Sequence, residues 1–239
     1  MLPRFVGRLS LADVVTASNA SLGFVAVVVA MQDVELAARL ILLAGIADGL
    51  DGVVARYSGG SKVGPYLDSL ADVASFSVAP AVLVYATVTS NWETVLSEPT
   101  LRTAVVLALP ALFVAMGVIR LGMYTAYDTA DTFTEGVPTT LAATILAAAV
   151  LCDVTDPALL LTGTAVFVYL MVSTVRYPDL LARDALLMGV VHALAVLFPY
   201  SWGRTFPWAI LTLALAYLLG GPWFYWRGGR VVTEWYGNA

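Results

Sequence analysis

Apolar residues run through the chain in long stretches that short polar breaks separate. Eight of these stretches approach the length needed to cross a bilayer, which is about 20 mostly apolar residues. They cover residues 14–31, 36–56, 65–89, 101–123, 137–152, 157–175, 184–199 and 206–225. The fifth and seventh are the shortest, so six or seven spans remain the alternative. The pattern predicts an all-α integral membrane protein with about eight transmembrane helices.

Composition supports a membrane protein and excludes several other classes. Of the 239 residues, 60% are apolar and only 12% are charged, whereas soluble domains carry about 25% charged residues. Cys152 is the single cysteine, so no intramolecular disulfide can form. The net charge is −5 with only 12 basic residues, which argues against nucleic acid as a partner.

The basic residues predict an orientation, because Lys and Arg near span ends stay on the cytoplasmic side. With a cytoplasmic N-terminus, that side receives nine basic residues: Arg4, Arg8, Arg56, Lys62, Arg120, Arg176, Arg183, Arg227 and Arg230. The other side keeps Arg39, Arg102 and Arg204. An even number of spans then returns the C-terminal tail to the cytoplasm. Reading the N-terminus as a secretory signal is the alternative, although polar residues from Thr16 to Ser21 interrupt its apolar region.

Four aspartates interrupt the second and third apolar stretches. They are Asp48, Asp51, Asp68 and Asp72. An Asp at the centre of a membrane helix costs about 2.5–3.5 kcal/mol on insertion scales and is presumed functional. Spacings of three and four residues put each pair on one helical face, and a loop of about eight residues between the helices makes them antiparallel neighbours. We expect the two acidic faces to meet at the cytoplasmic side.

Facing carboxylates in a low-dielectric setting require protonation or a cation. Hard divalent ions such as Mg²⁺, Mn²⁺ and Ca²⁺ prefer oxygen ligands, and two such ions held by carboxylates are a known device for phosphoryl chemistry. The alternative is four solvated aspartates that only flank the spans. His192, the single histidine, lies far from them in sequence and is interpreted as a packing residue.

Small and basic residues surround the acidic pairs. Gly52 and Ala55 share the face of Asp48, so a ligand or a neighbouring backbone could approach closely. Arg56 and Lys62 follow at the mouth of the predicted site and suit an anionic, phosphate-containing substrate. Anchoring at the cytoplasmic surface is the alternative for both.

The full pattern is Asp48-x-x-Asp51-Gly52-x-x-Ala55-Arg56-x7-Gly64-x3-Asp68-x3-Asp72. It resembles the signature of the CDP-alcohol phosphatidyltransferases, with one residue fewer than usual between its Arg and the following Gly. The resemblance implies that Asp48, Asp51 and Asp68 ligate two divalent ions, Mg²⁺ or Mn²⁺. It implies that Asp72 completes the metal site and acts as the base toward the acceptor hydroxyl. Gly52, Ala55, Arg56 and Gly64 are implied to line the CDP-lipid site.

Further fragments resemble the serine-using branch of this family, the phosphatidylserine and archaetidylserine synthases. In chain order they are Thr16, Asn19 and Gly23; Leu67 to Asp72 with Phe76 and Ala79-Pro80; Arg120-Leu121; Gly136 to Pro138; Met171 to Ser173; and Tyr177-Pro178. A serine substrate brings a carboxylate that needs a cation. Arg120 and Arg176 are the candidates, and topological anchoring is their alternative role.

The resemblance implies transfer of a phosphatidyl- or archaetidyl-type group from a CDP-linked lipid to L-serine, with release of CMP. It implies a core over residues 1–180, followed by two additional helices and a short cytoplasmic tail over residues 181–239. It also implies a multi-pass protein of the cell membrane, a site facing the cytoplasm and a homodimer. Another acceptor, glycerol phosphate or inositol phosphate, is the nearest alternative, and an ion-coupled transporter is a more distant one. Scarce Lys with an acidic balance is typical of proteins of salt-loving microbes and would suit an archaeol-type lipid, with GC-rich coding as the alternative explanation and a diacyl lipid as the alternative donor.

Overall fold

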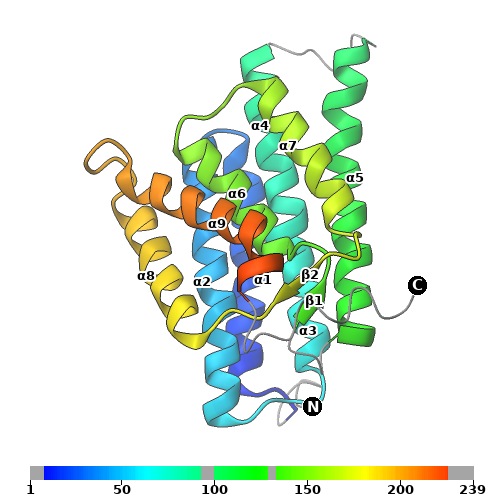
Figure 1. The fold of residues 1–239 in the computed structure, drawn as a ribbon, viewed down its shortest axis with the longest axis vertical. Coiled ribbons are helices and arrows are strands. Elements are labelled where there is room, and N and C mark those ends of the chain that lie inside the picture. The colour runs from blue at the N-terminus through cyan, green and yellow to red at the C-terminus, as the bar shows by residue number, and fades with distance from the viewer. Residues whose placement is uncertain (1–7, 93–99, 129–132, 226–239) are drawn as a thin grey trace, which may run out of the picture.

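The computed structural model describes residues 8–92, 100–128 and 133–225, which form eight helical rods and one short β-ribbon (Figure 1). The first four rods are α1 (Leu11–Ala30), α2 (Val34–Ser58), α3 (Gly64–Asp72) continued by the π-helical turn η1 (Val73–Val78) and α4 (Ala79–Trp92), and α5 (Leu101–Met123) extended by the π-helical turn η2 (Tyr124–Asp128). The others are α6 (Thr139–Leu151), α7 (Pro157–Leu170), α8 (Ala182–Leu197) and α9 (Thr205–Phe224). Strands β1 (Phe133–Glu135) and β2 (Arg176–Pro178) pair antiparallel.

Polar side chains fix where several helices begin. Ser10 and Asp13 form a reciprocal capping box at the start of α1. Asp33, Thr100 and Asp156 each accept a hydrogen bond from a backbone N–H in the first turn of α2, α5 and α7. These caps satisfy donors that would otherwise lie unpaired at the helix ends.

The rods lie where the hydrophobic pattern predicts helices, with one clear exception. The stretch at 157–175 was expected to stay helical throughout, but α7 ends at Leu170. The Ser173 hydroxyl donates to the Leu170 carbonyl at 2.8 Å, a local bond that competes with helical pairing. The chain then enters β2.

Four of the described helices are long and apolar enough to cross a membrane: Leu11–Ala30, Gly64–Trp92, Leu101–Tyr127 and Thr205–Phe224. The helices α6 and α7 are apolar but have only 13 and 14 residues. They rise by about 20 Å, less than the hydrocarbon core of about 30 Å. The 25-residue α2 is long enough but carries several charged residues, including Asp48 and Asp51. The chain is thus a helical multi-pass membrane protein.

The helix α6 lies at the centre of the fold (Figure 1). All its residues from Ala142 to Leu151 are buried, mostly small side chains that let neighbouring backbones approach. It packs against α2 on one side and against α9 on another. The hairpin of α8 and α9 lies beside α2 and α6, outside the bundle formed by the earlier helices (Figure 1).

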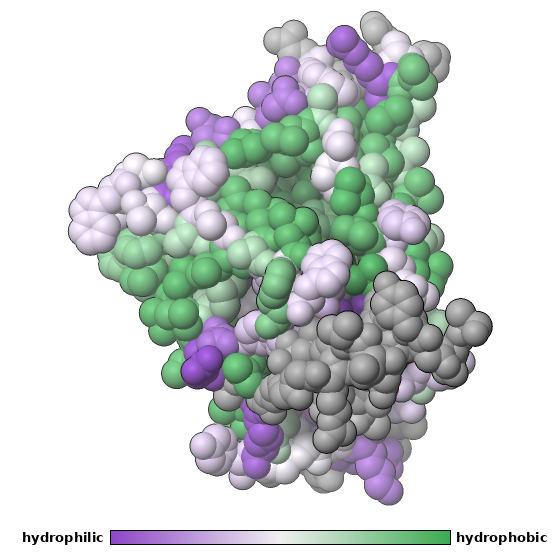
Figure 2. Space-filling view, in the orientation of Figure 1, coloured by the Kyte–Doolittle hydropathy of each residue, from purple (hydrophilic) through white to green (hydrophobic). Residues whose placement is uncertain are grey.

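The outer surface has the distribution expected of a membrane protein. Figure 2 shows apolar residues over the middle of the molecule and hydrophilic residues gathered toward its upper and lower ends. Large apolar side chains such as Phe24, Leu107 and Leu219 are exposed on the helices. Arg4, Arg227 and Arg230, which the orientation argument uses, and the expected C-terminal tail lie outside the described residues.

Candidate active site

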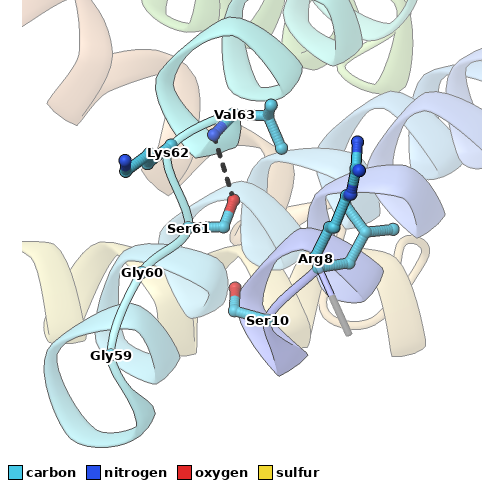
Figure 3. A pocket seen from close by; sticks show the side chains of 8 residues that line it. Arg8, Ser10, Gly59, Gly60, Ser61, Lys62 and Val63 are labelled. Atoms are coloured by element: carbon cyan, nitrogen blue, oxygen red, sulfur yellow. Dashed lines mark hydrogen bonds between the residues drawn. The ribbon is translucent and has the colours of Figure 1, made fainter. Parts of the chain in front are cut away.

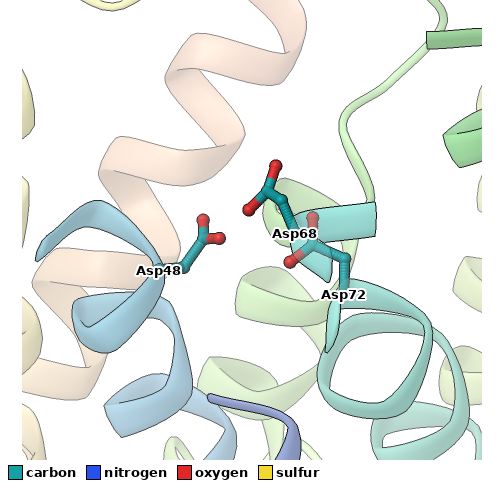
Figure 4. A group of neighbouring side chains, drawn as sticks. All are labelled: Asp48, Asp68 and Asp72. Carbon is teal, nitrogen blue, oxygen red and sulfur yellow. The ribbon is translucent and has the colours of Figure 1, made fainter. Parts of the chain in front are cut away.

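Asp48 of α2 and Asp68 and Asp72 of α3 turn their carboxylates toward one another (Figure 4). One oxygen of each lies within 4.8 Å of the others. Asp72 is buried, and Asp48 and Asp68 are half-buried. Because three carboxylates this close repel one another, a cation or protons must offset their charge.

Asp51 lies beside this group and is held from α1. The Thr16 hydroxyl donates to Asp51 Oδ2 at 2.6 Å, and both residues are buried. Asp51 is near enough for its charge to act on Asp48 and Asp68. The structure therefore brings all four predicted aspartates to one place, with three in a tight group and the fourth oriented by a hydroxyl.

Helix geometry explains this convergence. Asp48 and Asp51 are three residues apart on α2, and Asp68 and Asp72 are four apart on α3, so each pair shares a face. The connection at residues 59–63 reverses the chain, so α2 and α3 run in opposite directions, and both pack against α1 (Figure 1). Asp72 ends α3, where the π-helical turn η1 begins. Such turns occur frequently at functional sites.

The first helix contributes residues to which the sequence analysis gave no site role. Asn19 is fully buried, and its side-chain amide lies 3.5 Å from Asp72 Oδ1. Its own amide oxygen has no hydrogen-bond partner among the described residues. Ser75 of η1 donates to the Asn19 carbonyl at 2.8 Å, and a Cβ at Gly23 would lie only 2.6 Å from the Ser75 hydroxyl. The helical spacing of Thr16, Asn19 and Gly23 was the signal available in the sequence.

Arg120 reaches the same region from α5. It is 8% exposed, and its Nη2 donates to the Thr134 hydroxyl of β1 at 3.0 Å. The guanidinium carbon lies 5.0 Å from the centre of the Tyr124 ring. It is near enough for its charge to act on the Asp72 carboxylate. A buried cation beside a carboxylate group is a suitable partner for an anionic substrate.

Arg176, the second predicted candidate for the serine carboxylate, has different surroundings. It forms a half-exposed ion pair with Glu135 across the β-ribbon at 3.2 Å and lies over the Phe133 ring. Both arginines thus contact β1, but Arg120 is buried and its charge acts on Asp72, whereas Arg176 is half-exposed and paired with Glu135.

The other predicted substrate residues divide into two groups. Gly52 and Arg56 are exposed and Ala55 is half-buried along α2, and a Cβ at Gly52 would meet no atom within 4 Å. That face of α2 therefore offers space beside Asp48 and Asp51. A Cβ at Gly64 would instead lie 3.3 Å from Asp13 Oδ1, so Gly64 packs against α1.

Lys62 lines an open cleft of about 440 Å³ between the start of α1 and the connection from α2 to α3 (Figure 3). Arg8, Ser10, Gly59, Gly60 and Ser61 also line it. The Lys62 and Arg8 side chains point in different directions and do not converge on one point (Figure 3). His192, by contrast, is buried in α8 and bonded to the Met188 carbonyl at 2.8 Å, as expected of a packing residue.

The donor set of the site fits a hard divalent cation. The converging ligands are carboxylate oxygens, which Mg²⁺ and Mn²⁺ prefer. The unpartnered amide oxygen of the buried Asn19, next to Asp72, adds an acceptor that a cation or its water could satisfy.

Comparison with known proteins supports the same chemistry. Residues 9–175 match the family model for CDP-alcohol phosphatidyltransferase. The chain is 34% identical over 175 residues to a CDP-diacylglycerol–serine O-phosphatidyltransferase of Helicobacter pylori, covering 69% of this chain and 70% of that protein. It is 31% identical over 185 residues to the archaetidylserine synthase of Methanothermobacter thermautotrophicus, covering 71% and 70%.

The matched region contains the four aspartates, Arg120 and the whole of α1. The residues that the geometry brings together therefore lie within the matched region. The chain belongs to the CDP-alcohol phosphatidyltransferase family and is a membrane-bound transferase.

Proposed function

We propose that this enzyme transfers a phosphatidyl- or archaetidyl-type group from a CDP-linked lipid to the hydroxyl of L-serine and releases CMP. The observation that carries the proposal is the group of Asp48, Asp68 and Asp72, with a buried Arg120 whose charge acts on Asp72. The serine-using relatives support the choice of acceptor. The acidic composition favours an archaeol-type donor.

In the proposed reaction, the serine hydroxyl oxygen attacks the phosphorus attached to the lipid. The bond from that phosphorus to the oxygen of CMP breaks, and CMP leaves with this oxygen. Asp72 accepts the serine hydroxyl proton as general base. Arg120 binds the serine carboxylate and orients the hydroxyl toward the phosphorus.

Asp48, Asp51, Asp68 and Asp72 would hold two divalent ions, Mg²⁺ or Mn²⁺. When bound, such ions would supply positive charge for the phosphate and for the leaving group. Thr16 orients Asp51 through its hydroxyl, and Asn19 lies against Asp72. The open face of α2 at Gly52, with Ala55 and Arg56, would receive the CDP group, and Gly64 would support it by packing α3 against α1.

We also propose eight spans with a cytoplasmic N-terminus, so that the aspartates face the cytoplasm, where CMP is released. Residues 1–180 would form the catalytic core, and residues 181–239 would add the α8–α9 hairpin and a tail. A homodimer in the cell membrane completes the proposal. The basic residues Arg56 and Lys62, near the aspartates along the chain, support this orientation.

The direct test is CMP release by the purified protein in lipid nanodiscs, with a CDP-lipid and L-serine. We expect CMP and a serine phospholipid in equal amounts, and no CMP after chelation until Mg²⁺ or Mn²⁺ is added back. Parallel reactions with glycerol phosphate and inositol phosphate test the acceptor. Parallel ester- and ether-linked donors test the lipid. Faster CMP release with another alcohol than with serine would overturn the acceptor assignment.

A further inference from the structure

Two tyrosines join the last helix to the β-ribbon, and a third joins the end of that helix to the segment after the ribbon. Tyr217 of α9 donates to the Pro178 carbonyl of β2 at 2.5 Å, and Tyr177 of β2 donates to the Leu218 carbonyl of α9 at 3.2 Å. The Tyr217 ring centre lies 6.0 Å from that of Tyr177 and 5.7 Å from that of Tyr225. Tyr225 in turn accepts from the Leu181 N–H at 3.1 Å. The end of α9 is therefore bonded to β2 and to the segment that follows it.

The β-ribbon connects α9 to the buried Arg120. Tyr177 is paired with Thr134 in the antiparallel register, and the Thr134 hydroxyl accepts the hydrogen bond from Arg120. Tyr177, Thr134 and Arg120 are each less than 10% exposed. A continuous path of contacts thus runs from Tyr217 through the ribbon to the buried Arg120.

The ribbon needs such support. Each strand has three residues, and an isolated two-stranded ribbon is marginally stable at best. At its other end, Gly136 donates to the Val175 carbonyl at 2.8 Å, and Val137 donates to the Leu170 carbonyl at 3.0 Å. Helix α9 supplies the packing on the side of Pro178 that these bonds do not reach.

We propose that α9 is a positioning element for the acceptor side of the active site, acting through Tyr217 on the β-ribbon and Arg120. This inference rests on the proposed function, in which Arg120 binds the carboxylate of serine. It gives a role to a helix that lies beyond the residues matched by the family model.

The test is Tyr217→Phe, which removes the hydroxyl that bonds to Pro178 and keeps the ring. We expect the KM for serine to rise about two- to tenfold, as for the loss of one hydrogen bond, while kcat and the KM for the CDP-lipid stay within about twofold. If the Tyr217 hydroxyl were needed only for global folding, its removal would lower the yield of folded protein and leave the KM for serine unchanged. Tyr169→Phe, at an exposed position of α7, is the matched control and should behave as wild type.

Hydrogen–deuterium exchange gives a readout that needs no substrate. In Tyr217→Phe, we expect faster exchange at residues 133–137 and 175–178 and unchanged exchange in α2 and α3. Unchanged exchange in the ribbon, or an unchanged KM for serine in an active enzyme, would overturn the positioning role. If the wild-type protein releases no CMP with serine, the proposed acceptor is wrong. The positioning role is then tested by hydrogen–deuterium exchange in the β-ribbon and by the KM for the alcohol that the enzyme does accept.

Discussion

Hydroxyl and amide groups of α1 complete a site whose charges come from α2 and α3. Thr16 and Asn19 are buried in an apolar helix, where a polar group without a partner is unfavourable. Each is directed at one aspartate. The aspartates could be predicted from the sequence because charge in an apolar stretch is conspicuous and their spacing defines a face. The spacing of Thr16 and Asn19 put them on one face of α1 but did not show which groups they bond, because a polar side chain in a membrane helix can also bond its own backbone, as Thr16 does to Ala12.

Replacing Asp68 by Asn, or Asp51 by Asn, should lower kcat at least about a hundredfold, because each change removes a charge that the proposed metal site uses. The measurement is CMP release, with calorimetric titration of Mn²⁺ as a second readout. Asp153→Asn, exposed between α6 and α7, is the control. Wild-type turnover in both folded variants would contradict the metal mechanism.

Replacing Thr16 by Val should weaken metal affinity about 10- to 100-fold, the usual effect of losing a group that orients a metal ligand. Thr16→Ser keeps the hydroxyl and should restore most of the affinity. Titration of Mn²⁺ into both variants measures the difference. Equal affinities for Val and Ser at this position would show that the bond to Asp51 does not orient the ligand.

The helices, as elements, follow the hydrophobic pattern closely, whereas the ribbon does not. Eight apolar stretches correspond to eight helical rods because apolar length and capping residues define them locally. Strands of three residues are too short to show alternation. The position of the strands depends on contacts made by Arg120, Gly136 and Tyr177, and these contacts form only in the folded chain. The sequence therefore predicted Arg120 as a candidate but gave no means of separating its surroundings from those of Arg176.

Gly136 should tolerate no side chain. Its φ is +77°, and a Cβ there would collide with the Met171 carbonyl. The left-handed conformation alone disfavours alanine by about 1–2 kcal/mol, so Gly136→Ala should lower the free energy of unfolding by more than that. Thermal unfolding in detergent measures the loss. Gly163→Ala on α7, with open space around it, should be neutral or stabilising, and equal behaviour of the two variants would contradict this account.

At the scale of the whole molecule, the loop between α8 and α9 is fastened to the end opposite the aspartates along α2. Arg204 donates to Glu35 at 2.9 Å and to the Leu151 carbonyl at 2.6 Å, and Tyr200 also bonds to Glu35. The C-terminal hairpin is therefore attached at both ends, to α2 and α6 through Arg204 and to the ribbon through Tyr217.

Arg204→Ala should reduce the free energy of unfolding by about 1–2 kcal/mol, because it removes two hydrogen bonds in a partly exposed place. Turnover at the aspartates should be unchanged, since the contact lies at the other end of α2. Denaturation in detergent and CMP release measure the two quantities. Arg102→Ala, exposed on α5, is the control, and a loss of activity without a loss of stability would contradict the assignment.

The buried helix α6 has a consequence for how the protein is made. One of its walls is α9, which the ribosome synthesises more than fifty residues after α6 ends. During that interval, the nascent chain contains the aspartates and Arg120 but still lacks one of the neighbours that bury α6. We expect lipid or an insertion chaperone to shield this segment until residues 205–224 have been synthesised.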